Sequence, residues 1–121
     1  MNFIQRGSFF SAFSVIVGAF GAHGIKGKIS SELFEIYQTA NYYLFIHAIA
    51  IILYGLFCLL TKKETNTWPG SLFTLGILLF SGSLYLIVFT EIKAFGMITP
   101  LGGLSFIVAW IGFALQARKS F

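Results

Sequence analysis

Long runs without a charged residue dominate the chain. With histidine taken as neutral, such runs cover residues 7–25, 36–61, 65–90 and 94–117. Each can hold the roughly 20 apolar residues that cross a hydrocarbon core of about 30 Å. In lipid such segments have to be helices, because every backbone N–H and C=O needs an internal partner. The pattern predicts one all-α membrane domain over residues 1–121, with spans at Ser8–Ala22, Tyr43–Leu60, Ser71–Thr90 and Ile98–Gln116.

The segment before the second span has a different pattern. Ser30 and Ser31 are good N-cap residues, and Glu32 suits the first turn of a helix. Apolar and polar side chains then fall on opposite faces up to residue 40. We expect a short amphipathic helix at about 31–40 that lies on the membrane surface and runs into the second span.

Small residues recur at helical spacing in the first and fourth spans. Because lipid tails are as apolar as leucine, membrane helices associate through close backbone approach, which small residues permit. Spacings of three and four predict an up-down-up-down, left-handed four-helix bundle, with Phe and Leu facing lipid. Chance is the alternative, since Gly and Ser are common in membrane helices. We expect Gly18→Leu and Gly112→Leu to destabilise the bundle. The packing residues are Gly7, Ser11, Ser14, Gly18, Gly21, Gly102, Ser105, Ala109 and Gly112.

Composition excludes an ordinary soluble domain. Hydrophobic residues make up 57% of the chain and charged residues 10%, whereas soluble proteins average roughly 25% charged. The first span resembles a cleaved signal peptide, with Arg6 before it and small residues near its end, but the Gly/Ser stripe favours a retained helix. Cys58 is the one cysteine, so the chain cannot form an internal disulfide.

The flanking charges predict an orientation. Four spans place both termini on one side, together with five Lys/Arg, whereas the other side carries three, namely Lys26, Lys28 and Lys93. The positive-inside rule then places both termini in the cytoplasm. The net charge of +4 is explained by anionic lipid and requires no nucleic acid. The five charges on the side of the termini are Arg6, Lys62, Lys63, Arg118 and Lys119.

Polar side chains gather at the other end of the predicted spans. The chain has no aspartate, no phosphate loop and no CxxC or HExxH motif, and two histidines make a poor metal site. An ionisable residue in a span suggests function, and we expect His47 to pair with His23 first or Glu91 second. The simpler alternative is an interhelical hydrogen bond. The candidate residues here are His23, Gln38, Asn41, His47, Glu91, Thr99 and Pro100.

Three stretches resemble a known family. They are GAFGAHG at residues 18–24, YQTANYY at residues 37–43 with His47 after it, and GSLY at residues 82–85 with ITPLGG at residues 98–103. They are similar to the signature of domain-of-unknown-function family 423, whose eukaryotic relatives are called transmembrane protein 256. The resemblance implies a four-span protein of the bacterial inner membrane without an established activity, and it adds Tyr37 to the candidate site. Where this chain has Tyr43, the family often has glutamine.

Three functions remain open from the sequence. The first is a non-enzymatic bundle that binds membrane lipids, a second copy or another membrane protein. The second is a small-solute or ion transporter or channel that works as an oligomer. The third is an enzyme for a lipid-soluble substrate, with His23 or His47 as acid or base. We expect no cofactor and no metal.

Overall fold

The structure is a computed structural model that describes residues 1–62 and 67–121. It contains four helices that are long and apolar enough to cross a membrane, and no strand occurs in the described residues. The all-α four-span architecture expected from the sequence is therefore confirmed. The helices extend further than the predicted spans, covering Phe3–Ile25, Ser31–Thr61, Trp68–Thr90 and Lys93–Ser120.

The first span contains a wide turn in its middle. It begins as α1 (Phe3–Val15), continues as the π-helical η1 (Ile16–Gly21) and ends as α2 (Ala22–Ile25). Asn2 starts it with a capping box, in which the Asn2 and Gln5 side chains each accept from the other residue's backbone N–H.

The second span is a single uninterrupted helix. α3 (Ser31–Thr61) starts where the Ser30 hydroxyl accepts from the backbone N–H of Leu33, and Lys62 ends it in a left-handed conformation. Residues 31–40 are helical as expected, but they form the first turns of α3, and Tyr37 and Ala40 among them are buried. A separate surface helix is therefore not confirmed.

The third span, like the first, has a π-helical segment between two α-helical ones. α4 (Trp68–Gly76) leads into the π-helical η2 (Ile77–Ser81) and then into α5 (Gly82–Thr90). The short 3-10 helix η3 (Lys93–Met97) connects it to the fourth span, α6 (Thr99–Ser120). Pro69 and Pro100 lie in first turns, where a helix tolerates proline.

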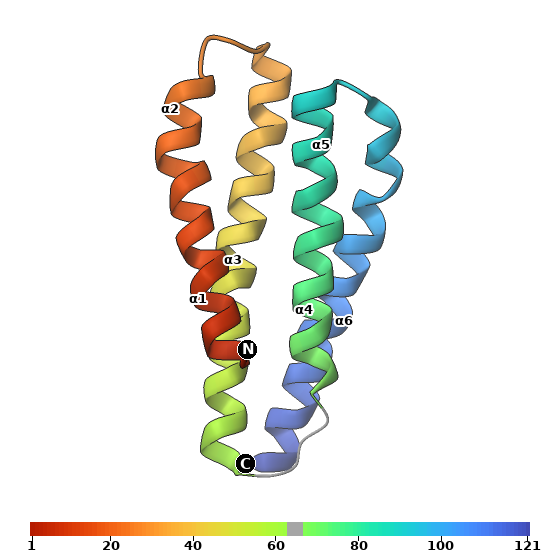
Figure 1. Cartoon of the computed structure of the whole chain (residues 1–121). Coiled ribbons are helices and arrows are strands. Elements are labelled where there is room, and N and C mark those ends of the chain that lie inside the picture. Colours follow the sequence, from red (N-terminus) through yellow and green to blue (C-terminus); the bar gives the residue numbers. More distant parts are fainter. Residues whose placement is uncertain (63–66) are drawn as a thin grey trace.

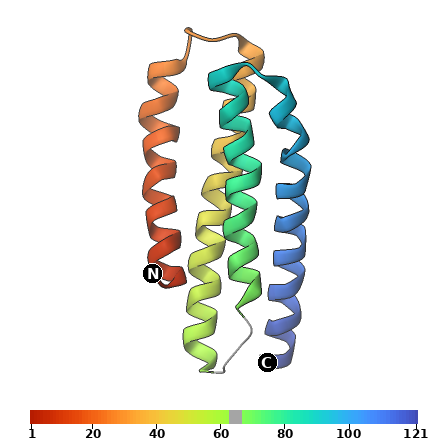
Figure 2. The ribbon, with the colours of Figure 1, turned by 45° about the vertical axis from the view of Figure 1, so that its right-hand side comes forward.

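The four spans run up, down, up and down around a central α3 (Figures 1 and 2). α3 packs along α1 on one side and along the third span on the other, while α6 packs mainly on the third span. Within an apolar stretch of 18 residues taken from each helix, 44% of the residues are buried in α3, but only 6% are buried in the first span. The first span is thus an outlying helix held by one neighbour, and most of its surface faces the surroundings.

The core contains aromatic side chains as well as small ones. Tyr54, Phe73 and Phe106 are buried in one cluster with Leu44 and Ile51, whereas large side chains such as Phe9 point outward. The expectation that Phe and Leu face lipid therefore holds for the outer surface but is wrong for the core.

Some of the predicted small packing residues contact a neighbouring helix, and others do not. In α6, a Cβ on Gly102 would overlap the Phe80 backbone, and one on Gly112 would overlap the Trp68 ring. Ser105 donates to the Leu72 carbonyl at 2.7 Å, and Ala109 is fully buried. In the first span, Gly7 and Ser14 of α1 are buried, whereas Ser11 of α1 and Gly21 of η1 are half-buried.

Gly18 does not pack against another helix. It is exposed, and a Cβ built on it would have no heavy atom within 4 Å. Its predicted packing role, and with it the expected destabilisation by Gly18→Leu, is wrong. Gly18 lies in η1, where a π turn places more residues per turn than an α turn, so spacings of three and four no longer keep every small residue toward α3. Gly21, at the end of η1, again meets α3, since a Cβ on it would overlap the Tyr37 hydroxyl.

Candidate functional site

The candidate polar residues do not meet in one place. His23 and Gln38 are exposed on α2 and α3, Glu91 is exposed and ends α5 with a positive φ of 57°, and Pro100 is exposed in the first turn of α6. They lie towards the end of the bundle that carries the α2–α3 and α5–η3 connections (Figure 1). The other four candidates, Tyr37, Asn41, His47 and Thr99, make contacts inside the bundle.

His47 joins α3 to α6. Its Nδ1 lies 2.8 Å from the Tyr43 carbonyl oxygen, and its Nε2 lies 3.1 Å from the indole nitrogen of Trp110. A carbonyl can only accept and an indole N–H can only donate, so the ring is neutral with its hydrogen on Nδ1. The expected pairing with His23 or Glu91 is wrong, and the interhelical hydrogen bond is the arrangement found.

Tyrosines connect three spans near the polar end. The Tyr37 hydroxyl donates to the Val17 carbonyl in η1, and the Tyr85 hydroxyl donates to the Asn41 side-chain oxygen at 2.5 Å. The Tyr37 and Tyr85 rings meet edge to face at 5.7 Å. Tyr37 is 1% exposed, so this contact between the first, second and third spans is inside the protein.

Hydroxyl groups of the third span tie it to both neighbours. Ser81 donates to the Ala40 carbonyl of α3 at 2.8 Å, and the Ser83 and Thr99 hydroxyls are 2.6 Å apart between α5 and α6. Polar side chains commonly connect membrane helices in this way. Thr99 therefore has a structural partner, and we assign it to helix packing.

The first and second spans touch closely at one end and separate at the other. A Cβ on Gly7 would lie 2.7 Å from the Ala48 carbonyl oxygen, and one on Gly55 would lie 3.0 Å from the Ile4 nitrogen. Beyond Ser14, the last buried residue of the first span, a groove opens between η1 and α3. Its volume is about 470 Å³.

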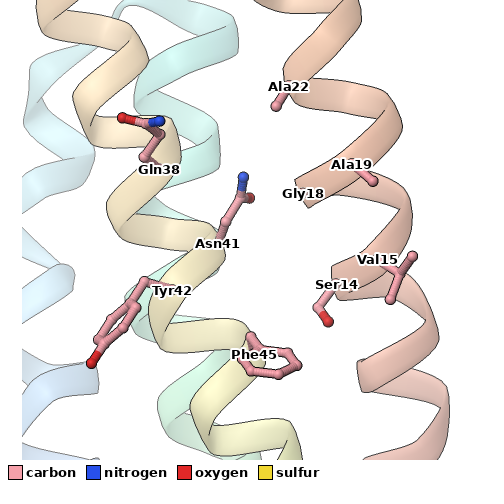
Figure 3. A pocket seen from close by; sticks show the side chains of 9 residues that line it. All are labelled: Ser14, Val15, Gly18, Ala19, Ala22, Gln38, Asn41, Tyr42 and Phe45. Atoms are coloured by element: carbon pink, nitrogen blue, oxygen red, sulfur yellow. The ribbon is translucent and has the colours of Figure 1, made fainter.

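The groove has one apolar wall and one mixed wall (Figure 3). On the α3 side, Asn41 and Phe45 point toward the first span, while Gln38 runs along α3 and Tyr42 points away from the first span. The wall from the first span is almost free of long side chains. The lining residues are Ser14, Val15, Gly18, Ala19 and Ala22 on the first span, and Gln38, Asn41, Tyr42 and Phe45 on α3.

A second pocket of about 360 Å³ lies between α3 and α6 beside His47. Aromatic rings form most of it. His47 stacks on Phe106 at 3.5 Å with an angle of 11° between the planes, and Tyr43 lies 4.3 Å from Phe80. Within residues 1–62 and 67–121, no group of three or more His, Cys, Asp or Glu side chains could hold a metal ion.

The roles of Trp110 and Tyr85 and the groove itself were not predicted from the sequence. A tryptophan in the middle of a span was a usable signal for Trp110, because an indole N–H in hydrocarbon needs an acceptor. Tyr85 belongs to a stretch already noticed, but its partner Asn41 is far from it in the chain. The groove lies beside the π segment η1, for which the residue pattern gave no indication.

Comparisons with known proteins place these features in a family. The model of the protein of unknown function family DUF423 matches residues 17–103, which include most of the groove lining together with Tyr37, Asn41 and His47. UPF0382 membrane protein SAB0533 of Staphylococcus aureus is 43% identical over 97% of this chain and 95% of its own length. UPF0382 membrane protein YwdK of Bacillus subtilis is 39% identical over 97% and 96%. No solved structure matches the chain. The chain therefore belongs to the DUF423 family and is a multi-pass membrane protein.

Proposed function

We propose that this protein binds a single membrane lipid in the groove between the first span and α3. The observation that carries the proposal is the groove itself, an open volume of about 470 Å³ with amide side chains on one wall. The proposed role is non-enzymatic: a lipid-binding site needs a fitting shape and a few polar contacts, and it needs no catalytic group. We further propose that the protein resides in the bacterial inner membrane with both termini in the cytoplasm.

The depth of the groove suits a lipid. α3 has 31 residues and is about 46 Å long at 1.5 Å per residue, so it exceeds the hydrocarbon core of about 30 Å. With α3 centred on the core, Gln38 lies near the hydrocarbon boundary, and Phe45 lies about 10 Å deeper. An acyl chain can therefore lie along Phe45 and the small residues of the first span. The Gln38 amide is then near the level of the ester carbonyls of a phospholipid, which accept hydrogen bonds, and the Asn41 amide lies about 4–5 Å deeper, beside the start of the acyl chain.

The histidines favour this proposal over an enzyme. His47 uses both ring nitrogens in contacts inside the bundle, with the Tyr43 carbonyl and with Trp110. A general acid or base has to reach the proton that it transfers. His23 lies on α2, outside the groove lining.

The proposal can be tested by placing a larger side chain in the groove at Gly18, where it disturbs no other contact. A side chain at Gly18 enters open space within the groove, and Gly24 is a matched control in the same span that also has no atom within 4 Å of its Cβ. We expect native mass spectrometry of wild-type protein and of Gly24→Leu to show one retained phospholipid. In Gly18→Leu the retained fraction should fall about tenfold, which corresponds to roughly 1.4 kcal/mol.

Both variants should unfold at the temperature of the wild type, since neither new side chain meets a neighbour. Equal lipid retention in Gly18→Leu and Gly24→Leu, with both variants folded, would contradict the proposal. So would lipid loss in both variants.

A further inference from the structure

We propose that the pocket beside His47 is a second binding site, which takes the ring of a lipid-soluble quinone. This pocket lies between α3 and α6 and shares only Tyr42 with the lipid groove. It is therefore independent of the proposed lipid site, and either site can be tested without the other.

The position of the pocket decides how an occupant arrives. His47 is about 24 Å from the start of α3 at Ser31, close to the middle of a helix of about 46 Å. It therefore lies near the centre of a hydrocarbon core of about 30 Å. Two apolar residues of the pocket are exposed, Ile46 on α3 and Ile107 on α6, at 36% and 58%. An occupant thus enters from the hydrocarbon and has to be soluble in it.

The walls of the pocket suit a flat ring. The Tyr43 plane is nearly parallel to those of His47 and Phe106, with angles of 7° and 18° and ring centres 5.9 and 6.2 Å apart. Aromatic rings prefer such offset stacking at about 4.5–7 Å. A volume of about 360 Å³ is at the small end of the ligand-site range of roughly 300–1,000 Å³. A one- or two-ring headgroup fits such a space, while its isoprenoid tail stays in the bilayer.

The polar groups of the pocket suit a neutral acceptor. No hydrogen bond joins the Tyr43 hydroxyl to any group in the described part of the chain, so this hydroxyl is available as a donor. A hydroxyl in hydrocarbon is unfavourable until it meets an acceptor. The pocket has no Lys, Arg, Asp or Glu in its lining, so it offers nothing to neutralise a charged ligand. A quinone carbonyl provides an uncharged acceptor on a flat ring.

Trp110 supplies a direct readout, because its indole lines the pocket and contacts His47. Trp68 is the other tryptophan of the chain and lies outside the pocket lining. In full-length Trp68→Phe protein in lipid nanodiscs, titration with decylubiquinone should quench the remaining tryptophan emission along a saturating curve. Decylbenzene has the same tail and no carbonyl, and it should neither quench nor compete.

Variants locate the binding. Tyr43→Phe keeps the ring and removes the hydroxyl, so the dissociation constant should rise about three- to tenfold, the effect of one neutral hydrogen bond. Gly103→Val adds bulk at a pocket residue whose Cβ would meet only the Phe80 ring, at 3.8 and 3.9 Å, and should weaken binding at least about tenfold. Gly82→Val is the matched control, since its Cβ meets nothing within 4 Å and it lies outside the pocket.

Several results would overturn the inference. Quenching that rises linearly with decylubiquinone indicates simple partitioning into the bilayer. Competition by decylbenzene indicates an apolar pocket without preference for a quinone. Equal affinities of Tyr43→Phe and the parent protein for decylubiquinone would show that the Tyr43 hydroxyl is not the donor. This conservative variant decides the question if Gly103→Val fails to fold. Gly18→Leu should keep the parent affinity for decylubiquinone, so a failure of the lipid proposal is separable from a failure of this one.

Discussion

At the scale of single residues, two adjacent glycines in α6 have opposite surroundings. A Cβ on Gly102 would overlap the backbone of Phe80, lying 2.8 Å from its Cα. A Cβ on Gly103 would meet only the Phe80 ring, at 3.8 and 3.9 Å. Gly102 is therefore required by the approach of α6 to η2, whereas Gly103 has room for a side chain. The spacing of small residues in the sequence predicts a packing position for Gly102 and not for Gly103.

We expect Gly102→Ala to lower the free energy of unfolding by about 1–3 kcal/mol, the usual cost of forcing extra atoms into a packed interface. Gly103→Ala is the matched control and should be neutral or stabilising by up to about 1 kcal/mol, since alanine favours helix. Thermal unfolding of both variants in the same detergent measures the difference. Equal unfolding temperatures would show that α6 does not rest on the Phe80 backbone.

At the scale of elements, the two π segments come from different spans but face the same turn of α3. In η1 the Val17 carbonyl accepts from Tyr37, and in η2 the Ser81 hydroxyl donates to the Ala40 carbonyl. Tyr37 and Ala40 are one turn apart on α3 and are 1% and 0% exposed. The Tyr37 bond connects the upper part of the first span to α3 beside the groove. The periodicity of the sequence predicted straight α-helices and missed both segments.

We expect Tyr37→Phe to loosen the upper part of the first span. The loss of one interhelical hydrogen bond should cost about 0.5–1.5 kcal/mol. Amide hydrogen exchange should then increase in residues 16–25 and stay unchanged in residues 3–15, where Gly7 holds α1 against α3. Tyr42→Phe is the control, since Tyr42 is 61% exposed and its hydroxyl has no bond to the described residues. Faster exchange along the whole span, or in neither part, would contradict this assignment.

At the scale of the whole molecule, charge is distributed unequally between the two ends. Both termini lie in the lower half of the molecule in two views (Figures 1 and 2). Arg6, Lys62, Arg118 and Lys119 belong to that half, and Lys63, which the span order assigns to the same side, lies outside the described residues. The opposite end carries Lys26, Lys28 and Lys93. This bias supports the proposed orientation with cytoplasmic termini.

We expect site-directed labelling to report that orientation. Single-cysteine proteins are made from a Cys58→Ala background with either Lys28→Cys or Lys119→Cys. A membrane-impermeant maleimide should label the Lys28→Cys protein in intact bacterial protoplasts, and the Lys119→Cys protein only after the membrane is opened. Both positions are exposed, so access depends on the side of the membrane alone. The reverse labelling pattern would show that the termini lie outside.

Part of the candidate site could be predicted from sequence. His47 stood out because an ionisable side chain in an apolar run needs a partner, and Asn41 because it leads into the same span at the polar end, whereas Tyr37 was added by the family resemblance. The structure gives each of the three residues a hydrogen-bond partner. Their partners could not be predicted, because Trp110 and Tyr85 lie on other helices at 63 and 44 residues' separation. A pairing at that distance depends on how the helices turn about their axes, which local periodicity does not specify.

The sequence by itself determined that four apolar helices cross a membrane, because uncharged runs of this length cannot remain in water and must satisfy their backbone internally. Only the tertiary structure decided which small residues are packed. Gly102 is closed in by a neighbouring backbone, while Gly18 borders an open groove. The reason is geometric: a π turn changes the face that every later residue presents, and the separation of two helices is a property of the pair.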